Sequence, residues 1–470
     1  MSSTLAIVNG RVWKRPGATA VLVDGERISA VGDDRFSADR VIDAGGLTIL
    51  PAFNDAHVHF LTASRSLGEL DLFGLETQAQ IESRITEYAR RHKGAWVVGR
   101  GWFYSAFPGG MPTVDLLDRL VPDRPAYLES FDAHTGWANS RALSMVGVAT
   151  RDVLTEATML GFVDAMPRRS KSEDLEALRA GMRVAAAKGI ASVQEAGDGQ
   201  NQIGLWTALR DSGELSIRVR LAFDLEPGTD ISRYDGLRRE DDRWVSTGIL
   251  KAFADGVVES KTAAMLDLYE GSDEKGTAIW ARHELATAVH QADERGWQIE
   301  IHAIGDAAVR QALDALEDMT PGRRHRIEHI ETPDPRDIPR FATLGVIASM
   351  QPQHADPTIT QAWRHQLGTD RASRGWPWKA IRNAGGRLAF GTDWPVVPLD
   401  PFASIRMAVT GGLTLEEAVD AWTSGSAYAE HMDHEKGEVR EGCLADLTVV
   451  DLERATVALT VVGGRVVYES

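Results

Sequence analysis

Eight short apolar strands that alternate with helical segments predict an α/β fold, a TIM (β/α)8 barrel. Strand-rich segments at both chain ends predict a small β-sandwich domain formed from both termini. A long stretch between the first two barrel strands predicts an inserted α/β subdomain. The chain has 470 residues, enough for a barrel-sized domain with these additions.

The two chain ends share one pattern, short strands broken by glycine and aspartate turns. Isolated short strands bury too little surface to be stable alone, so the two ends are expected to pair into one composite sandwich, residues 1–50 and 432–470. The expected strands lie at residues 5–8, 20–23, 27–31, 446–450, 457–462 and 465–468.

The barrel is assigned to residues 51–64 and 181–431. Helical patterns at 285–294 and 306–316 separate neighbouring strands, as a parallel barrel requires. The eight strands are expected at residues 47–53, 190–194, 217–221, 249–255, 297–302, 325–329, 346–350 and 386–393.

The first barrel strand is expected to end near His59, and the second begins near Ile190. A structureless loop of that length would be implausible in a compact domain. The intervening residues 65–180 contain strand patterns of their own at 95–99 and 126–129. They are predicted to form an α/β subdomain over the mouth of the barrel.

Composition argues against several classes of partner. The formal net charge is −17 and no basic tract occurs, so neither nucleic acid nor a membrane is an expected partner. No apolar run approaches the ~20 residues of a membrane span, and the N-terminus does not read as a signal peptide. The single cysteine, Cys443, excludes an intramolecular disulfide and a cysteine-based zinc site. A cytoplasmic protein with a small-molecule substrate is expected, and a homo-oligomer is left open.

His57 and His59 stand two residues apart, near the end of an apolar strand pattern. Residues i and i+2 of a strand project to the same side, so both imidazoles can bind one metal ion. The carboxyl ends of barrel strands meet at one rim, so polar residues at the ends of later strands should join this pair. Those residues are Lys251, His302, His329 and Asp393.

Lys251 suits a site with two metal ions only after modification. A protonated lysine repels cations and a neutral amine bridges them poorly, whereas a carbamate formed with carbon dioxide offers bridging oxygens. The alternative is an unmodified Lys251 that pairs with Asp255. Metal ions would lower the pKa of water, and the resulting hydroxide would attack an acyl carbon. Asp393 could then carry the proton to the leaving nitrogen.

These residues resemble the amidohydrolase superfamily, and specifically the branch called amidohydrolase family 3, which includes N-substituted formamide deformylase. The chain departs from the family in having Pro51-Ala52 for Pro-Gly and Gly391-Thr392-Asp393 for Gly-Ser-Asp. The similar motifs cover nearly the whole chain and include Gly101-Trp102, Asp132-Ala-His-Thr-Gly-Trp-Ala-Asn-Ser140, His302-Ala-Ile-Gly-Asp306, His325-Arg-Ile-Glu-His329, Gln351-Pro352 and Gly391-Thr-Asp-Trp-Pro-Val396.

The resemblance implies a metal-dependent hydrolase. The ligand residues themselves lead us to expect two divalent ions and an N6-carboxylated Lys251, with zinc as the expected metal although manganese and iron suit the same ligands. The resemblance implies that six residues are metal ligands: His57, His59, Lys251, His302, His329 and Asp393. It also implies that His134 is a catalytic, substrate-binding donor. Trp102, Trp137 and Trp394 are expected as substrate contacts because they fall in predicted loops, not because of the resemblance. The alternative for each tryptophan is packing. Together they suggest an apolar or aromatic-bearing substrate.

The predicted reaction is hydrolysis of a carboxamide-type C–N bond, as in an N-acyl or N-formyl amine. Ring deamination and lactone, carbamate or phosphotriester hydrolysis are alternatives on the same scaffold. His302 is followed by Ala-Ile-Gly-Asp without a glutamate, which weighs against deamination. A non-catalytic binding protein is disfavoured because all six candidate ligands are present. His325 is expected to give polar support rather than to bind metal.

Overall fold

The computed structural model describes residues 4–33, 35–131, 135–150, 152–167 and 169–470. The chain divides into two compact units. The first unit comprises Met1–Phe60 and Gly181–Ser470, and the second comprises Leu61–Ala180.

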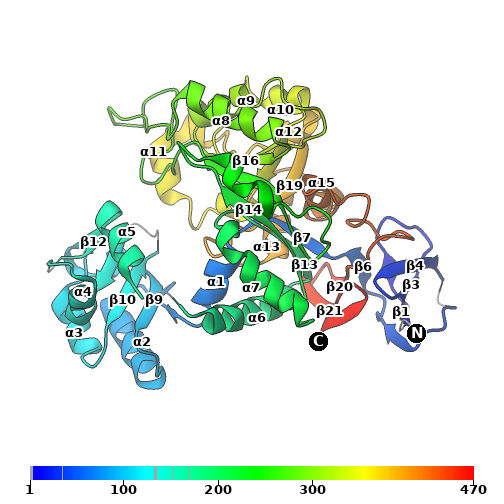
Figure 1. Ribbon diagram of the computed structural model, residues 1–470, viewed down its shortest axis with the longest axis horizontal. Coiled ribbons are helices and arrows are strands. Elements are labelled where there is room, and N and C mark those ends of the chain that lie inside the picture. The colour runs from blue at the N-terminus through cyan, green and yellow to red at the C-terminus, as the bar shows by residue number, and fades with distance from the viewer. Residues whose placement is uncertain (1–3, 34, 132–134, 151, 168) are drawn as a thin grey trace. The chain divides into compact units, whose positions relative to one another are not determined.

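An eight-stranded parallel sheet forms the centre of the first unit (Figure 1). Each strand pairs with the next one along the chain, from β7 to β19. The two outer strands also meet, because Asp393 N donates to His57 O (2.7 Å) and His59 N donates to Trp394 O (2.9 Å). The predicted TIM barrel is confirmed. Its strands are β7 (Phe53–Val58), β13 (Ile190–Glu195), β14 (Arg218–Asp224), β15 (Val245–Phe253), β16 (Gln298–Ala303), β17 (Arg326–His329), β18 (Ile347–Met350) and β19 (Arg387–Phe390).

Helices connect the barrel strands, and the two predicted from periodicity are present as α8 and α9. In α8 the residues Leu285, Val289 and Ala292 are buried, which is the i, i+4, i+7 face that the sequence pattern shows. The connecting helices are α7 (Gly199–Asp211), η3 (Ile231–Leu237), α8 (Arg282–Glu294), α9 (Asp306–Ala315), α10 (Ile338–Leu344), η4 (Pro352–Ala355), α11 (Gln361–Ala372) and α12 (Trp378–Asn383). Three more helices follow β19 and lead to the sandwich: α13 (Pro401–Thr410), α14 (Leu415–Trp422) and α15 (Ser424–Ala429).

The prediction of residues 47–53 as the first barrel strand was wrong. Residues Thr48–Pro51 form β6, which pairs with β20 (Leu447–Asp451) in a different sheet. The change of sheet occurs at one residue: Ala52 N donates to Asp446 O, whereas Phe53 N donates to Gly189 O of the barrel. The apolar run is continuous through both strands, so hydrophobicity alone gives no sign of the boundary.

The sandwich is built from both chain ends, as predicted. One sheet has the order β4-β3-β1-β5 and the other β2-β6-β20-β21-β22. Figure 1 shows the red C-terminal strands beside the blue β6. Apolar residues of both sheets, such as Ile7 and Val461, share one core with Cys443. The remaining strands are β1 (Thr4–Val8), β2 (Arg11–Val12), β3 (Ala20–Asp24), β4 (Arg27–Gly32), β5 (Arg40–Asp43), β21 (Thr456–Val462) and β22 (Arg465–Glu469).

The second unit is the inserted α/β subdomain, with one mixed sheet in the order β12-β11-β10-β9-β8. Two of these strands, β9 and β10, were predicted, and they pair in parallel. α1 (Phe60–Ser66) leads into this unit along the chain, and α6 (Lys171–Ala187) leads out of it. The other elements are β8 (Leu70–Asp71), α2 (Gln78–Arg91), β9 (Val97–Trp102), η1 (Tyr104–Ala106), η2 (Pro108–Gly110), α3 (Val114–Leu120), β10 (Ala126–Ser130), β11 (Thr135–Ala138), α4 (Ser140–Val146), β12 (Leu154–Thr155) and α5 (Glu156–Ala165).

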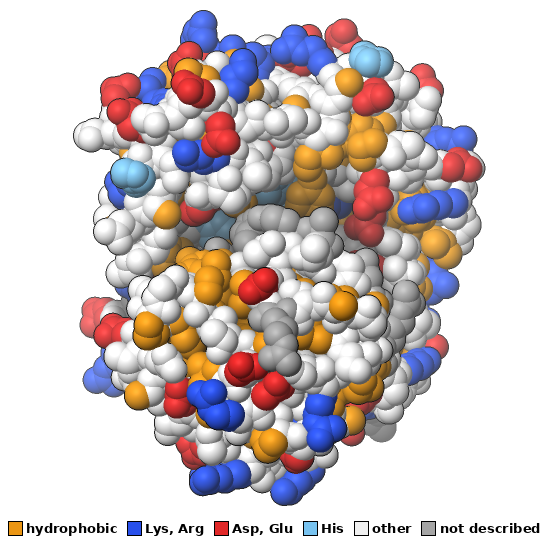
Figure 2. All heavy atoms as spheres, turned by 90° about the vertical axis from the view of Figure 1, so that its left-hand side faces the viewer, with side chains coloured by type: hydrophobic (Ala, Val, Ile, Leu, Met, Phe, Trp, Pro, Cys, Tyr) orange, Lys and Arg blue, Asp and Glu red, His pale blue; other side chains and the backbone are white. Residues whose placement is uncertain are grey.

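Lysine and arginine side chains are interspersed with aspartate and glutamate over the face drawn in Figure 2. A mixed surface of this kind, on a chain with a net charge of −17, does not favour a polyanionic partner. No helix among the described residues has both the length and the apolar character needed to cross a membrane.

His325 has a structural role in the barrel wall. Its Nδ1 accepts the backbone N–H of Ile299 (3.0 Å), and its Nε2 lies 3.0 Å from Asp293 Oδ1. An imidazole that accepts at one nitrogen and donates from the other is neutral. Burial lowers the pKa of His325 from 6.5 to about 4, despite the opposing influence of Asp293.

We expect the free energy of unfolding to fall as the pH drops below 6.5. The His325 imidazole binds a proton near pH 6.5 in the unfolded chain but only near pH 4 in the folded protein, so acid favours the unfolded state. Between pH 7 and pH 5 the loss attributable to His325 is about 2 kcal/mol. Urea unfolding of the wild type and of His325→Gln should show a smaller pH dependence in the variant. The exposed His283→Gln on α8 is the control, and equal pH dependence in all three proteins would contradict this role.

Candidate metal centre

Three of the predicted ligands lie together at the carboxyl end of the barrel. His57 Nε2 lies 3.5 Å from Asp393 Oδ1, and His59 Nε2 lies 3.3 Å from the same oxygen. The side chains of His57 and Asp393 are nearly buried, whereas that of His59 is one-third exposed. Two imidazole nitrogens and a carboxylate oxygen at this spacing are a donor set suited to a divalent cation.

The turn after β19 aims Asp393 at the two histidines. Asp393 adopts a left-handed backbone conformation (φ 60°), which aspartate tolerates better than most residues. Asp55 holds this turn, since it accepts hydrogen bonds from Thr392 N (3.0 Å) and Thr392 Oγ1 (2.6 Å). A Cβ at Gly391 would collide with the backbone nitrogen of His57, so only glycine permits this close approach of β19 to β7.

A buried carboxylate orients His57. Glu328 Oε2 lies 2.6 Å from His57 Nδ1, which leaves Nε2 directed towards Asp393. Arg326 Nε lies 2.8 Å from the other oxygen of Glu328, and Arg326 also pairs with Glu300 in the barrel interior. Burial raises the pKa of Glu328 and lowers that of His57 well below its ordinary value. A carboxylate behind a histidine in this way fixes the ring tautomer and strengthens the other nitrogen as a ligand.

A second group gathers around the other oxygen of Asp393. His329 Nδ1 lies 3.9 Å and His354 Nε2 lies 3.7 Å from Asp393 Oδ2. The two imidazole rings are stacked, with centroids 6.0 Å apart. His354 was missed by the sequence analysis because it lies in the turn η4, beyond the end of β18, and strand ends were the signal used. Gln351-Pro352, two residues upstream of His354, was the nearest motif noticed.

Lys251 lies in β15 with 1% of its surface exposed, and its Nζ has no hydrogen-bond partner among the described residues. Burial lowers its pKa, which favours the unprotonated amine. The alternative pairing with Asp255 does not occur. Asp255 instead accepts backbone N–H groups from Ala264, Ile304 and Gly305, at 2.8 to 3.0 Å.

His302, at the end of β16, is buried beside the centre. Its ring centroid lies 4.4 Å from that of His329. Its Nε2 lies 3.2 Å from the carbonyl oxygen of Gly256 and 3.7 Å from Asp255 Oδ1. Burial lowers the pKa of His302 to about 3, so the ring is neutral. Its predicted role as a metal ligand stays a prediction.

The arrangement of these groups fits a bound metal. Several buried polar atoms at this end of the barrel have no hydrogen-bond partner among the described residues, and they include Lys251 Nζ, His329 Nδ1, His354 Nε2 and Asp393 Oδ1. Each such atom costs roughly 1–3 kcal/mol when it is left unsatisfied, so a cluster of them points to a missing partner. Imidazole nitrogens and carboxylate oxygens suit zinc and several other divalent ions.

The predicted substrate contacts receive little support. Trp102 and Trp137 are fully buried in the core of the second unit, where their indole N–H groups donate to Leu128 O (3.0 Å) and Thr113 O (2.8 Å). Both positions therefore give the tryptophans a packing role. His134 lies outside the described residues.

Trp394 is buried in the first unit beside the candidate ligands. Its ring centroid lies 5.6 Å from that of Phe60, and its carbonyl oxygen accepts the N–H of His59. The structure thus shows a backbone role for this residue, and substrate contact by its ring stays a prediction.

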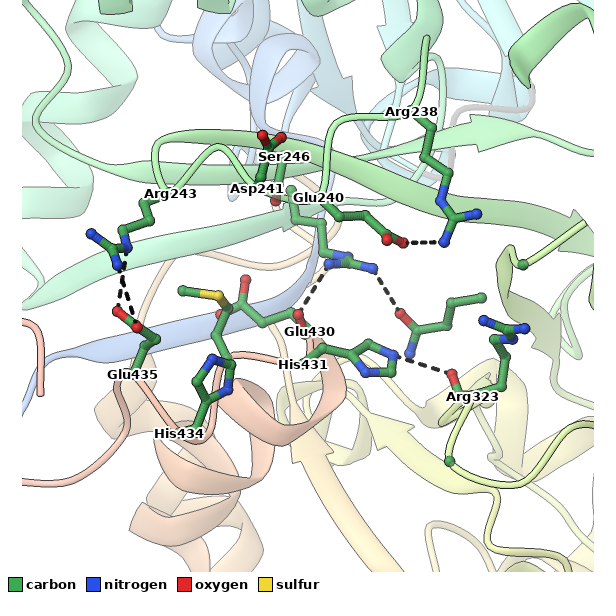
Figure 3. Close-up of a pocket in the computed structure, with 15 residues that line it drawn as sticks. Arg238, Glu240, Asp241, Arg243, Ser246, Arg323, Glu430, His431, His434 and Glu435 are labelled. Atoms are coloured by element: carbon green, nitrogen blue, oxygen red, sulfur yellow. Dashed lines mark hydrogen bonds and ion pairs between the residues drawn. The ribbon is translucent and has the colours of Figure 1, made fainter. Parts of the chain in front are cut away.

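A different polar pocket, of about 470 Å³, lies at the amino end of the barrel strands (Figure 3). Its charged side chains pair with one another: Arg238 lies 2.8 Å from Glu240, and Arg243 lies 3.3 Å from Glu435. Side chains at this end of a TIM barrel generally contribute to stability rather than to catalysis. The pocket is therefore separate from the candidate metal centre.

The fold and this centre define a class of protein, a metal-dependent hydrolase on a TIM barrel with an added sandwich. The sequence model described as the amidohydrolase family matches residues 40–468. The chain belongs to this family, as the sequence motifs indicated.

Three curated proteins illustrate the relationship. The Arabidopsis thaliana protein LONG AFTER FAR-RED 3 is 27% identical, with 99% of this chain and 88% of that protein covered. The putative amidohydrolase YtcJ of Bacillus subtilis is 27% identical (91% and 90% covered). The N-substituted formamide deformylase of Arthrobacter pascens is 24% identical (95% and 93% covered).

Among solved structures, an uncharacterized metal-dependent hydrolase from Pyrococcus horikoshii superposes with a TM-score of 0.82. The match covers 96% of this chain and 98% of that one at 22% identity, and it shows a shared fold.

We expect Glu328→Gln to weaken metal binding by about 10- to 100-fold, because His57 would lose the carboxylate that fixes its ring. Competition with a zinc chelator measures this change on the purified protein. Glu453→Gln, in an exposed turn of the sandwich, is the matched control. If the folded Glu328→Gln protein bound metal with unchanged affinity, Glu328 would not be the residue that positions His57.

Proposed function

We propose that this protein hydrolyses a carboxamide-type C–N bond in a small molecule, such as an N-acyl or N-formyl amine, with two divalent metal ions. Zinc is the proposed metal. The observation that carries the proposal is that the two oxygens of Asp393 face different histidines, with His57 and His59 at Oδ1 and His329 at Oδ2. A carboxylate placed in this way can serve two neighbouring ions.

The metal ions, when bound, would lower the pKa of water and polarise the substrate carbonyl. His57 and His59 would hold one ion, and Asp393 would accept the proton from the nucleophilic water. Asp393 would then return this proton to the leaving nitrogen, so that the amine departs in neutral form. The buried position of Asp393 restricts exchange of the proton with bulk water.

Lys251 would supply the bridge between the ions in its N6-carboxylated form. Its Nζ is buried without a hydrogen-bond partner among the described residues, where it lies 4.9 Å from the centre of the Phe253 ring, and no described carboxylate forms an ion pair with it. These conditions favour the neutral amine that reacts with carbon dioxide. The resulting carbamate would carry the negative charge that two cations require.

Support for the proposed substrate class comes from the family and from one relative. The Arthrobacter pascens protein, whose name describes deformylation of N-substituted formamides, aligns with 95% of this chain. At 24% identity that activity supports the type of bond and not a particular substrate. Deamination and lactone, carbamate or phosphotriester hydrolysis are the competing reactions in a screen of the metal-loaded protein.

We expect Asp393→Asn to keep the fold but to lower turnover by roughly 10²- to 10⁴-fold even with zinc in excess, because an amide cannot carry the proton. The kcat on an amide that the wild type hydrolyses, with metal content measured in parallel, tests this role. A wild-type kcat in the variant would exclude Asp393 as the proton carrier.

Lys251→Ala is expected to lose metal and activity, and a short carboxylate such as acetate with added zinc should restore part of both. The rescue follows because a free carboxylate can occupy the space of the carbamate. Lys275→Ala, at an exposed position, is the control and should behave like the wild type. Full metal content and activity of Lys251→Ala without rescue would contradict a bridging carbamate.

A further inference from the structure

We propose that His354 is a metal ligand, and that His329, His354 and Asp393 together bind the second divalent ion. The inference rests on the proposed function, in which Asp393 serves two ions. It adds a residue that lies outside the six candidates found in the sequence, and it assigns the site to a transition-metal cation of the zinc type.

The geometry of the three donor atoms supports a shared ion. His354 Nε2 and His329 Nδ1 lie 3.7 Å and 3.9 Å from Asp393 Oδ2, and all three lie within 4.8 Å of one another. Donor atoms that each lie about 2.1 Å from a tetrahedral ion are separated by ~3.4 Å. The two distances to Asp393 Oδ2 exceed this value by ~0.3 and ~0.5 Å, and the two imidazole nitrogens lie within 4.8 Å of each other.

The donors are also free to bind. His354 Nε2 and His329 Nδ1 are both buried and have no hydrogen-bond partner among the described residues. His302 differs, because its Nε2 already lies 3.2 Å from the carbonyl oxygen of Gly256. Of the three histidines, His329 and His354 thus present the free nitrogens on the Oδ2 side of Asp393.

The surroundings of His354 resemble those of an established type of metal-binding histidine. Glu331 Oε1 lies 3.6 Å from His354 Nδ1, on the side of the ring away from Asp393. Glu331 is held in turn by Trp363, whose Nε1 donates to Glu331 Oε2 (2.8 Å), and by Trp376, whose backbone N donates to Glu331 O (2.8 Å). The 3.6 Å separation is slightly longer than a hydrogen bond, and a carboxylate on this side of the ring is in the position from which it can orient a ligating histidine.

A role of His354 as a hydrogen-bond donor to substrate is the competing explanation. The side chain of His354 is only 11% exposed, which limits the approach of a substrate atom. An ion bound by His354 would also give His329 Nδ1 the partner that it lacks among the described residues. A substrate that contacts only His354 would leave that nitrogen without a partner. Metal binding therefore explains more of the observed geometry.

The test measures zinc binding by the full-length protein, without any substrate. Wild type, His354→Ala and His354→Gln are stripped with chelator, reloaded, and titrated with zinc against a chromophoric competitor. His365→Ala, an exposed histidine on α11, is the matched control. We expect two tight equivalents in wild type and control, and a second equivalent weakened at least 100-fold in both His354 variants.

Cobalt substitution gives a second readout. The visible d–d absorption of the second cobalt equivalent should shift in intensity or wavelength when His354 is replaced. Glu331→Gln should keep both equivalents but weaken the second by about 10-fold, and this variant leaves the ligand itself in place. Thermal unfolding of each apo-protein confirms that the variants are folded.

Unchanged zinc affinities and cobalt spectra in folded His354 variants would overturn the inference. This failure is distinguishable from failure of the proposed function. A protein that binds two ions through His354 but hydrolyses no amide would refute the proposed reaction and leave the ligand assignment intact. A protein that hydrolyses amides and binds both ions equally well without His354 would refute the ligand assignment and leave the proposed reaction intact.

Discussion

The closure of the barrel between β7 and the segment after β19 is the constraint on which the site depends. Two backbone hydrogen bonds, from Asp393 N to His57 O and from His59 N to Trp394 O, join residues that are more than three hundred positions apart. The same peptide groups carry the histidine pair and the aspartate. Closing the barrel and assembling the first three ligands are therefore one event, and Gly391 permits it because a side chain there would keep the two strands apart.

The barrel interior beneath the ligands is polar, which is unusual for a packed core. Arg326 is fully buried and lies between the carboxylates of Glu300 and Glu328, with Gln194 as a further partner. Burial of so many charges is tolerated only when each is paired and hydrogen-bonded. This network of buried charges holds Glu328 in contact with His57. The barrel interior therefore sets the orientation of His57, a candidate metal ligand at the rim.

Much of the fold was readable from the sequence, because strand and helix periodicities alternate clearly and because the sandwich strands occur at both ends. The division of residues 47–53 between two strands at Ala52 could not be read, since β6 and β7 are equally apolar and differ only in their partners. The expectation that ligands lie at the carboxyl ends of barrel strands identified His57, His59 and Asp393, which the structure brings together. It missed His354, which reaches the same place from a turn. Trp102 and Trp137 lie among glycine- and proline-containing stretches that read as loops, while their burial is decided by tertiary packing.

Because the chain passes from the sandwich to the barrel at Ala52, the C-terminal strand β20 helps to position the strand that carries His57. Strand β6 is held by β20, and one residue later the chain enters the strand that carries His57. The final segment of the polypeptide thus acts as an anchor for the first barrel strand, although it contributes no candidate ligand. A newly synthesised chain would complete that anchorage only after β20, which follows the whole barrel in the sequence, so assembly of a firm ion-binding rim has to wait for a strand made long after β6 and β7.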